Sequence, residues 1–222
     1  MTIWYGGGGS TGKMTKAICI LIGYLCGNFL TAELVARRYA GKRAAEVGGT
    51  GNPGMANIMA QLGFLPGIIT LAGDLGKCVI ACLICHELFR NSGWIVVLYA
   101  GLGCTLGHDF PFWRGFRGGK GVATTSMAIV FYAFLPGLAA NIAGMLVVFA
   151  TKYLCIGGPV IPLCFAVLMM LRGDHEAAFL AIVLFALSVY SHSGSILGIR
   201  RGETKKTDVL GAMRRGRENP KK

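Results

Sequence analysis

Long apolar runs alternate with short polar segments over most of this 222-residue chain. Seven runs are separated by glycines, prolines and charges, at residues 17–36, 62–85, 94–112, 122–135, 137–153, 159–171 and 177–199. Because a helix needs about 20 apolar residues to cross a bilayer, the pattern predicts an all-α membrane bundle of about seven transmembrane helices. Two of the runs, 122–135 and 159–171, are short, so five spanning helices with re-entrant segments is the alternative. Pro136-Gly137 and Gly157-Gly158-Pro159 are expected to separate neighbouring helices.

The composition agrees with a polytopic integral membrane protein. Hydrophobic residues make up 54% of the chain and charged residues only 14%, against about 25% charged residues in soluble domains. No long polar segment is present to build a soluble domain, so we expect one integral membrane domain over residues 1–222. Residues 1–14 are glycine-rich and are predicted to form a flexible leader, and residues 207–222 a basic cytoplasmic tail.

The distribution of lysine and arginine predicts the orientation. With the amino terminus outside, seventeen basic residues fall on the cytoplasmic side and four on the outer side, and positive charge normally remains in the cytoplasm. Apart from the leader, this orientation places the glycine-rich polar segments on one side of the membrane. The net charge of +12 suits anionic lipid head groups and phosphorylated substrates. Nucleic acid is not an expected partner, because the basic residues are scattered among short loops without interleaved aromatic residues.

Two opposite charges lie inside one apolar run. Asp74 and Lys77 are three residues apart and therefore share a helix face. Each charge alone costs about 2.5–3.5 kcal/mol at the bilayer centre, so an ion pair facing other helices is the first interpretation. The alternative is that the pair supports a functional site from behind.

Cysteine chemistry is not expected to carry the function. The eight cysteines lie almost entirely in apolar runs, where cysteine usually packs as a small hydrophobic residue. Cys82 and Cys85, followed by His86, have a ligand-like spacing, but no second cluster accompanies them. We therefore predict no metal site.

The most informative segment is Gly107–Thr124, which contains five glycines, His108 and three basic residues between two apolar runs. Glycines allow a ligand to approach the backbone closely, and amides at a helix start favour phosphate. The backbone amides of Gly118, Gly119 and Gly121, together with Lys120, are accordingly predicted to bind phosphate at the membrane surface.

Two further polar regions fall on the same predicted side. Gly48–Asn57 carries four glycines, a hydroxyl and two amides, which suit an anion or a hydroxyl-bearing ligand, although a plain turn is the alternative. Its Gly49–Gly54 portion fits the dinucleotide pattern formally, but no βαβ unit surrounds it. The other region combines Lys152–Gly158 with His192 and Gly202-Glu203.

Together these segments resemble the bacterial acyl-phosphate-dependent glycerol-3-phosphate acyltransferase family of the PlsY type. The resemblance runs in order from about residue 20 to residue 206 and rests on Gly49–Gly54 with Asn57, Asp74 and Lys77, Gly107-His108, Phe110-Pro111, Gly118–Thr124, Lys152-Tyr153, His192 and Gly202-Glu203. It implies a seven-helix fold and a cytoplasm-facing site in the bacterial inner membrane. It also implies transfer of a fatty acyl group from acyl phosphate to glycerol 3-phosphate, giving lysophosphatidate and phosphate.

The resemblance assigns roles to individual residues. The implied catalytic residues are His192, Lys120 and Thr50. The implied substrate- and phosphate-binding residues are Gly51, Asn52, Gly54, Asn57, His108, Gly118, Gly119, Gly121, Cys155, Ser195 and Glu203. An acyl phosphate is already activated, so no serine or cysteine nucleophile is required, and no metal, cofactor or obligate protein partner is expected. The partners are the two substrates and the lipid bilayer.

The chain departs from the family pattern at several positions. Thr50 replaces a serine and keeps its hydroxyl, whereas Ala60 replaces an arginine and removes a phosphate-binding cation. Cys155, Ser193 and Ser195 replace a serine, an arginine and an asparagine. These changes leave two alternatives open: a paralogue with another acceptor, and a non-catalytic lipid-binding or regulatory protein of the same fold. A transporter is less consistent with the sequence, because it shows no internal repeat.

Overall fold

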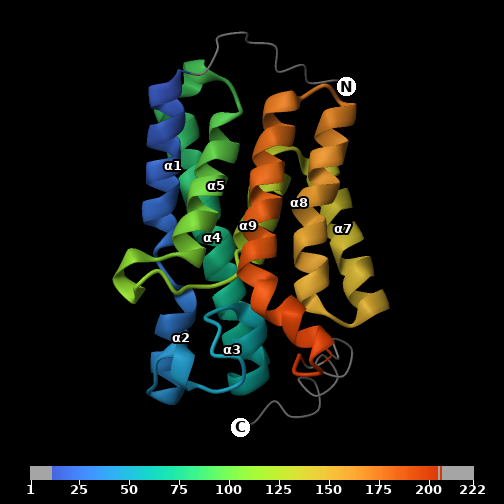
Figure 1. Cartoon of the computed structure of the whole chain (residues 1–222). Helices are drawn as coiled ribbons and strands as arrows, with labels where there is room; N and C mark the ends of the chain where they lie inside the picture. The colour runs from blue at the N-terminus through green and yellow to red at the C-terminus, as the bar shows by residue number, and fades with distance from the viewer. Residues whose placement is uncertain (1–11, 205, 207–222) are drawn as a thin grey trace.

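The computed structural model describes residues 12–204 and 206, and every regular element within them is helical. The chain forms an elongated bundle of roughly parallel and antiparallel helices (Figure 1). The α-helices are α1 (Lys13–Gly27), α2 (Thr31–Ala40), α3 (Met55–Leu62), α4 (Phe64–Leu88), α5 (Val96–Asp109), α6 (Val122–Tyr132), α7 (Phe134–Thr151), α8 (Leu154–Leu171) and α9 (His175–Arg200). Three short 3-10 turns are η1 (Ala44–Glu46), η2 (Arg90–Ser92) and η3 (Phe112–Arg114).

The predicted all-α membrane bundle is confirmed, and each of the seven apolar runs contains helix. Within residues 12–204, five helical stretches are long and apolar enough to cross a membrane: Lys13–Ala40, Phe64–Leu88, Phe134–Thr151, Leu154–Leu171 and His175–Arg200. The other two, α5 and α6, have 14 and 11 residues, fewer than the roughly 20 of a full span. Seven full-length spans are therefore not established.

The two predicted helix breaks are present, but they do not lie at the prolines. Pro159 lies inside α8, together with Pro162, and Pro136 lies in the first turn of α7, where proline removes no helical hydrogen bond. The chain breaks instead at Ala133 and at Lys152, whose φ is +64°. Close packing of α8 against α7, in which glycines contact the facing backbone, keeps α8 continuous.

The ends of the chain lie largely outside the described residues. Of the predicted leader, residues 1–11 are not described, and its last two residues, Lys13 and Met14, already belong to α1. The predicted tail, residues 207–222, is also outside the described part of the chain.

Glycines bring α1 and α5 into backbone contact. Gly23 and Gly27 of α1 face Gly103 and Gly107 of α5, and a Cβ at any of the four would overlap a carbonyl oxygen of the opposite helix. Without a hydrophobic driving force inside lipid, small residues that allow such close approach are the main source of helix association. The α1–α5 pair thus forms a rigid wall of the bundle.

Lys77 supplies hydrogen-bond donors to backbone carbonyls at the break between α1 and α2. Its Nζ donates to the carbonyl oxygens of Gly27 at 3.2 Å and Phe29 at 2.8 Å, and it lies 3.0 Å from Oδ1 of Asp74. The predicted ion pair is therefore confirmed, and it has a further purpose. Backbone carbonyls freed by a helix break at membrane depth need internal donors, and the Lys77 ammonium group supplies them.

The same ammonium group orients His108. Lys77 Nζ lies 2.8 Å from Nδ1 of His108, and a charged lysine has no acceptor. Nδ1 must therefore accept, which places the proton of the neutral ring on Nε2. Beyond the ring lies Gly119, where any Cβ would overlap the imidazole. Lys77 thus connects the helix break to the glycine-rich loop through His108.

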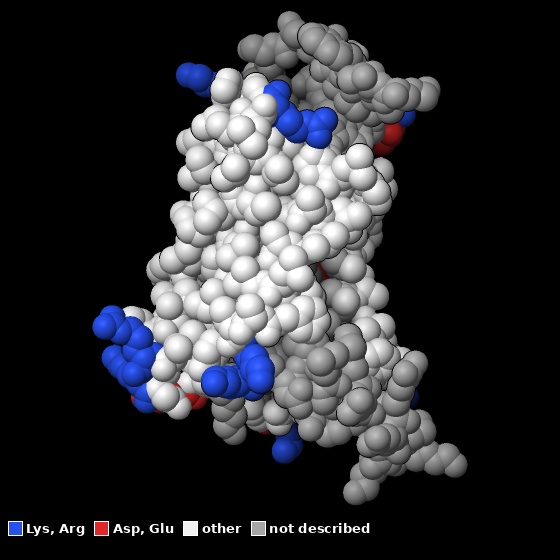
Figure 2. Space-filling model, turned by 90° about the vertical axis from the view of Figure 1, so that its right-hand side faces the viewer, with Lys and Arg blue, Asp and Glu red and all other residues white. Residues whose placement is uncertain are grey.

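Polar loops and basic residues gather at one end of the bundle. The loops before and after η1, the helix α3, the segment 110–121 and the end of α9 all lie at the lower end in Figure 1. Figure 2 shows lysine and arginine at the two ends, with a band lacking both on the visible face between them. The described basic residues at the lower end, the basic end, are Arg37, Arg38, Lys42, Arg43, Arg114, Arg117, Lys120, Lys152, Arg200, Arg201 and Lys206, whereas the opposite end has Lys13, Lys16, Arg90 and Arg172.

The α1–α5 contact predicts a specific sensitivity to an added methyl group. Gly107→Ala should destabilise the protein by about 1–3 kcal/mol, because the new Cβ overpacks against the backbone of α1. The matched control is Gly76→Ala on α4, where a Cβ meets nothing within 4 Å. Thermal unfolding in one detergent should show a lower midpoint for Gly107→Ala only, and equal midpoints for the two variants would contradict this packing.

Candidate functional site

A cavity of about 560 Å³ opens at the basic end, and we call it the cationic pocket. Three segments far apart in the sequence form its walls: the loop before α3, the loop before α6 and the last third of α9. Its lining residues are Ala45, Thr50, Gly51, Asn52, Pro53, Arg114, Arg117, Gly118, Lys120, Ser191, Gly194 and Ser195. Three cations and several hydroxyl and amide groups thus share one cavity, which suits a phosphorylated ligand.

Asn57 shapes the first wall. Its Oδ1 accepts from the Thr50 amide at 2.9 Å and from the Thr50 hydroxyl at 3.2 Å, and its Nδ2 donates to the Gly48 carbonyl at 3.2 Å. A Cβ at Gly49 would overlap the Asn57 amide group, which explains why the loop needs glycine there. Asn57 is buried, so it positions Thr50 and does not itself line the cavity.

The second wall is folded by the glycines of the segment before α6. The Gly118 amide donates to the Asp109 carbonyl at 2.9 Å, and the Gly119 amide donates to the His108 carbonyl at 2.9 Å. A side chain at Gly118 would overlap the same His108 carbonyl. Both amides are therefore already used to fold the loop against α5, so these two of the predicted phosphate donors are not available to a ligand.

Lys120 reaches from this loop across to α9. Its Nζ donates to the hydroxyl of Ser195 at 2.6 Å, which holds the ammonium group at the wall of the cavity. Burial lowers the pKa of Lys120 from its ordinary value of 10.5, and the nearby Cys155 and Asp109 partly oppose the shift. The lysine is thus a positioned, partly buried cation, a setting in which attraction to a phosphate is stronger than in bulk solvent.

His192 lies behind the cavity. It is buried, its Nδ1 is 2.8 Å from the Ser188 carbonyl, and its ring faces Gly158 of α8. Its neighbours on α9, Ser191 and Ser195, line the cavity, whereas His192 does not. Lys120 and His192 nevertheless occupy the same end of the bundle, as the predicted site requires.

The predicted site residues divide into two groups. Six of them line the cationic pocket: Thr50, Gly51, Asn52, Gly118, Lys120 and Ser195. The others do not line it: Gly54, Asn57, His108, Gly119, Gly121, Cys155, His192 and Glu203. Several of these support the lining residues from behind, whereas the Glu203 side chain is exposed beyond the end of α9.

The structure adds residues that the sequence had not indicated as site residues. Ser191 donates from the pocket wall to Oδ2 of buried Asp109 at 2.6 Å. Arg114 pairs with buried Glu33 at 3.1 Å. The sequence did carry a signal for the two carboxylates, Asp109 and Glu33, because each lies within a predicted span. An ionisable residue there usually has a structural or functional partner. Nothing in the sequence indicated Ser191, because its partner is distant along the chain.

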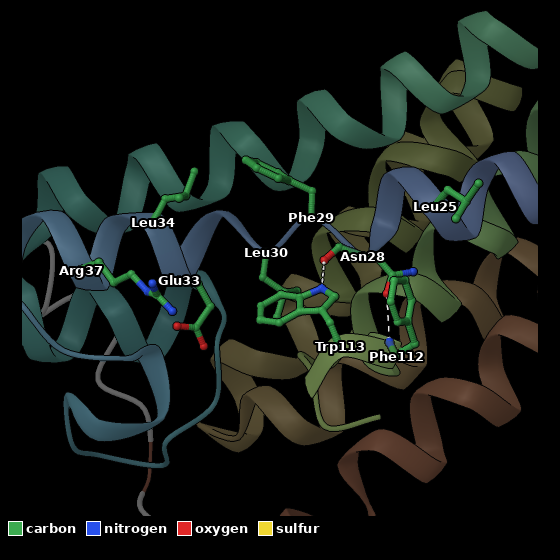
Figure 3. A pocket seen from close by; sticks show the side chains of 9 residues that line it. All are labelled: Leu25, Asn28, Phe29, Leu30, Glu33, Leu34, Arg37, Phe112 and Trp113. Atoms are coloured by element: carbon green, nitrogen blue, oxygen red, sulfur yellow. Dashed lines mark hydrogen bonds between the residues drawn. The ribbon is translucent and has the colours of Figure 1, made fainter. Parts of the chain in front are cut away.

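A second hollow of about 520 Å³ lies beside the break between α1 and α2, and we call it the lateral hollow (Figure 3). Its lining is mostly apolar: Leu25, Asn28, Phe29, Leu30, Glu33, Leu34, Arg37, Phe112 and Trp113. Figure 3 shows Asn28 between the break and η3, where its Oδ1 accepts from the Phe112 amide at 3.0 Å and its carbonyl accepts from Trp113 Nε1 at 2.9 Å. These bonds anchor η3, which ends in Arg114, to the first helices.

Comparisons with known proteins point to one family. The family model described as glycerol-3-phosphate acyltransferase matches residues 17–202. Glycerol-3-phosphate acyltransferase 1 of Lactobacillus acidophilus is 37% identical over 202 residues, covering 91% of this chain and 97% of the relative. The protein of the same name from Lactobacillus johnsonii is 35% identical over 197 residues, covering 89% and 95%.

Solved structures show the same fold. The crystal structure of PlsY (YgiH), an integral membrane glycerol 3-phosphate acyltransferase, superimposes in its glycerol 3-phosphate form with a TM-score of 0.78 at 25% identity, covering 89% of this chain and 98% of that one. Its lysophosphatidic acid form gives a TM-score of 0.76 over the same shares. The resemblance inferred from the glycine-rich motifs is thereby confirmed, and the chain belongs to the glycerol-3-phosphate acyltransferase family.

Proposed function

We propose that this protein transfers a fatty acyl group from an acyl phosphate to glycerol 3-phosphate, releasing lysophosphatidate and inorganic phosphate. The observation that carries the proposal is the convergence of Lys120, Thr50 and Ser195 in one pocket at the basic end. The relatives are named for glycerol 3-phosphate acylation, and the PlsY structure was obtained in glycerol 3-phosphate and lysophosphatidic acid forms. Both support the same acceptor here.

The reaction needs orientation and charge neutralisation more than a protein nucleophile. The acceptor hydroxyl oxygen attacks the carbonyl carbon of the mixed anhydride, and the bond from that carbon to the phosphate oxygen breaks. The phosphate leaves with the electron pair, and the hydroxyl proton passes to a phosphate oxygen. Two phosphate groups must therefore lie side by side, and the three lining cations Arg114, Arg117 and Lys120 oppose their mutual repulsion.

The remaining predicted residues take supporting roles in this proposal. Thr50 and Asn52 offer a hydroxyl and an amide to the glycerol backbone, while Asn57 holds the Thr50 loop. His192 acts through α9, which carries Ser191 and Ser195 into the cavity. The proposal requires no metal, cofactor or obligate protein partner.

The excess of basic residues at the pocket end supports a cytoplasmic orientation in the bacterial inner membrane. A paralogue with another phosphorylated acceptor is the second candidate. The observation that favours it is Ala60, which is exposed on α3 where the family has an arginine.

The first test is phosphate release by the purified protein in lipid nanodiscs, supplied with palmitoyl phosphate and glycerol 3-phosphate. Release should depend on both substrates and yield lysophosphatidate, and Lys120→Met should lower kcat/KM by about 100-fold through loss of a charged phosphate contact. The control is Lys42→Met, which changes an exposed lysine in the loop after α2 at the same end. Phosphate release that is independent of glycerol 3-phosphate would show that the acceptor is wrong.

The lowered pKa of Lys120 predicts where kcat/KM begins to fall on the alkaline limb of its pH profile. Only the ammonium form binds phosphate, so kcat/KM should fall as pH rises through the pKa of Lys120, starting below the 10.5 of an ordinary lysine. Lys120→Arg keeps its charge above pH 12, so this variant should shift that limb upward even if its rate is lower. An alkaline limb that does not move in Lys120→Arg would assign it to another group.

A further inference from the structure

We propose that Arg114, clamped by Glu33, binds the phosphate of glycerol 3-phosphate and takes over the task of the cation that Ala60 removes. This inference rests on the proposed function and extends it, since it names the residue that recognises the acceptor. Arg114 ends η3 and lines the cationic pocket beside the loop that carries Thr50. Neither the motifs nor the family comparison assigned it a role.

The guanidinium group is held in place from one side. Arg114 Nη2 lies 3.1 Å from Oε1 of Glu33, and only 8% of the arginine side chain and 6% of the glutamate side chain are exposed. The other carboxylate oxygen, Oε2, accepts from the Ala44 amide at 3.1 Å. Glu33 thus fixes Arg114 against both α2 and η1, so little side-chain entropy remains to be lost when a ligand binds.

The other terminal nitrogen of the guanidinium group lacks a hydrogen-bond partner within the described part of the chain. Arg114 Nη1 is buried and has no hydrogen-bond partner among the described residues. Buried donors are normally paired, and an exception calls for an explanation. Because Arg114 is a lining residue of the cationic pocket, the phosphate of a ligand bound there is the candidate acceptor for this group.

Charge and location favour the acceptor phosphate over the donor phosphate. Glycerol 3-phosphate brings a free phosphate dianion, for which arginine is a preferred partner. The first loop, with Thr50, Asn52 and Pro53, lines the same cavity as Arg114. Both cations come from the segment before α6, but their partners differ: Arg114 pairs with Glu33 of α2, and Lys120 donates to Ser195 of α9. The two cations therefore suit different phosphates.

The test measures steady-state kinetics for each substrate separately. Arg114→Lys keeps the charge opposite Glu33 but loses the second amino group, and should raise KM for glycerol 3-phosphate by about 10-fold or more with little change in KM for palmitoyl phosphate. Arg38→Gln, which removes an exposed arginine from α2, should leave both KM values unchanged. A rise confined to the KM for palmitoyl phosphate would overturn the assignment.

A double variant separates binding from folding. Arg114→Gln alone leaves the Glu33 charge buried without its partner, which can prevent folding, whereas Glu33→Gln/Arg114→Gln removes both charges. The double variant should fold, as judged by its thermal midpoint, and still show a KM for glycerol 3-phosphate raised by about 10- to 100-fold. A wild-type KM in the folded double variant would show that the pair is purely structural.

A binding measurement distinguishes failure of the proposed function from failure of the role assigned to Arg114. Glycerol 3-phosphate should raise the thermal midpoint of the wild type, and glycerol, which lacks the phosphate, should not. Stabilisation should be lost in Glu33→Gln/Arg114→Gln and retained in Arg38→Gln. If glycerol 3-phosphate does not stabilise the wild type and is not acylated by it, the proposed function fails. If glycerol 3-phosphate stabilises all three proteins equally, only the role of Arg114 is overturned.

Discussion

The Lys77 ammonium group is the constraint on which the rest of this structure depends. Its three N–H donors serve two carbonyls of the α1–α2 break and Nδ1 of His108, with Asp74 as the counter-ion. A break at membrane depth is stable only if its carbonyls are satisfied from within the protein. Through Lys77 the break is connected to α5, and through the backbone and ring of His108 to the glycine-rich loop before α6.

This connection brings the lining residues of the cationic pocket together at one end of the bundle. The break redirects the chain from α1 to α2, and α2 carries Glu33 to the inner side of Arg114. The glycine-rich loop carries Lys120 to Ser195 on α9. Glycines in the loop thus allow close packing, and side chains supply the positive charge of the cationic pocket. The loops at this end pack tightly around the buried pairs Asp74–Lys77 and Glu33–Arg114. This packing leaves a cavity with several cations in its wall.

The sequence predicted the helical bundle and the end at which basic residues gather, because apolar run length and charge asymmetry are direct consequences of the bilayer. It also indicated Thr50 and Lys120, whose segments carry dense glycine and polar signals. It placed the helix breaks at prolines, but tight packing between α7 and α8 overrides the tendency of Pro159 to interrupt a helix. It could not find Ser191 or the Glu33–Arg114 pair, because those contacts arise only when distant segments meet.

The most direct test of the Lys77 account is hydrogen–deuterium exchange of the protein in lipid nanodiscs, comparing the wild type with Asp74→Leu/Lys77→Met. The double change removes both charges, so no unpaired ion remains in the membrane. The account predicts faster exchange at the Gly118 and Gly119 amides, whose acceptors are carbonyls of α5, with unchanged exchange in α7 and α8. Unchanged exchange of the loop in a folded double variant would contradict the claim that Lys77 holds the site together.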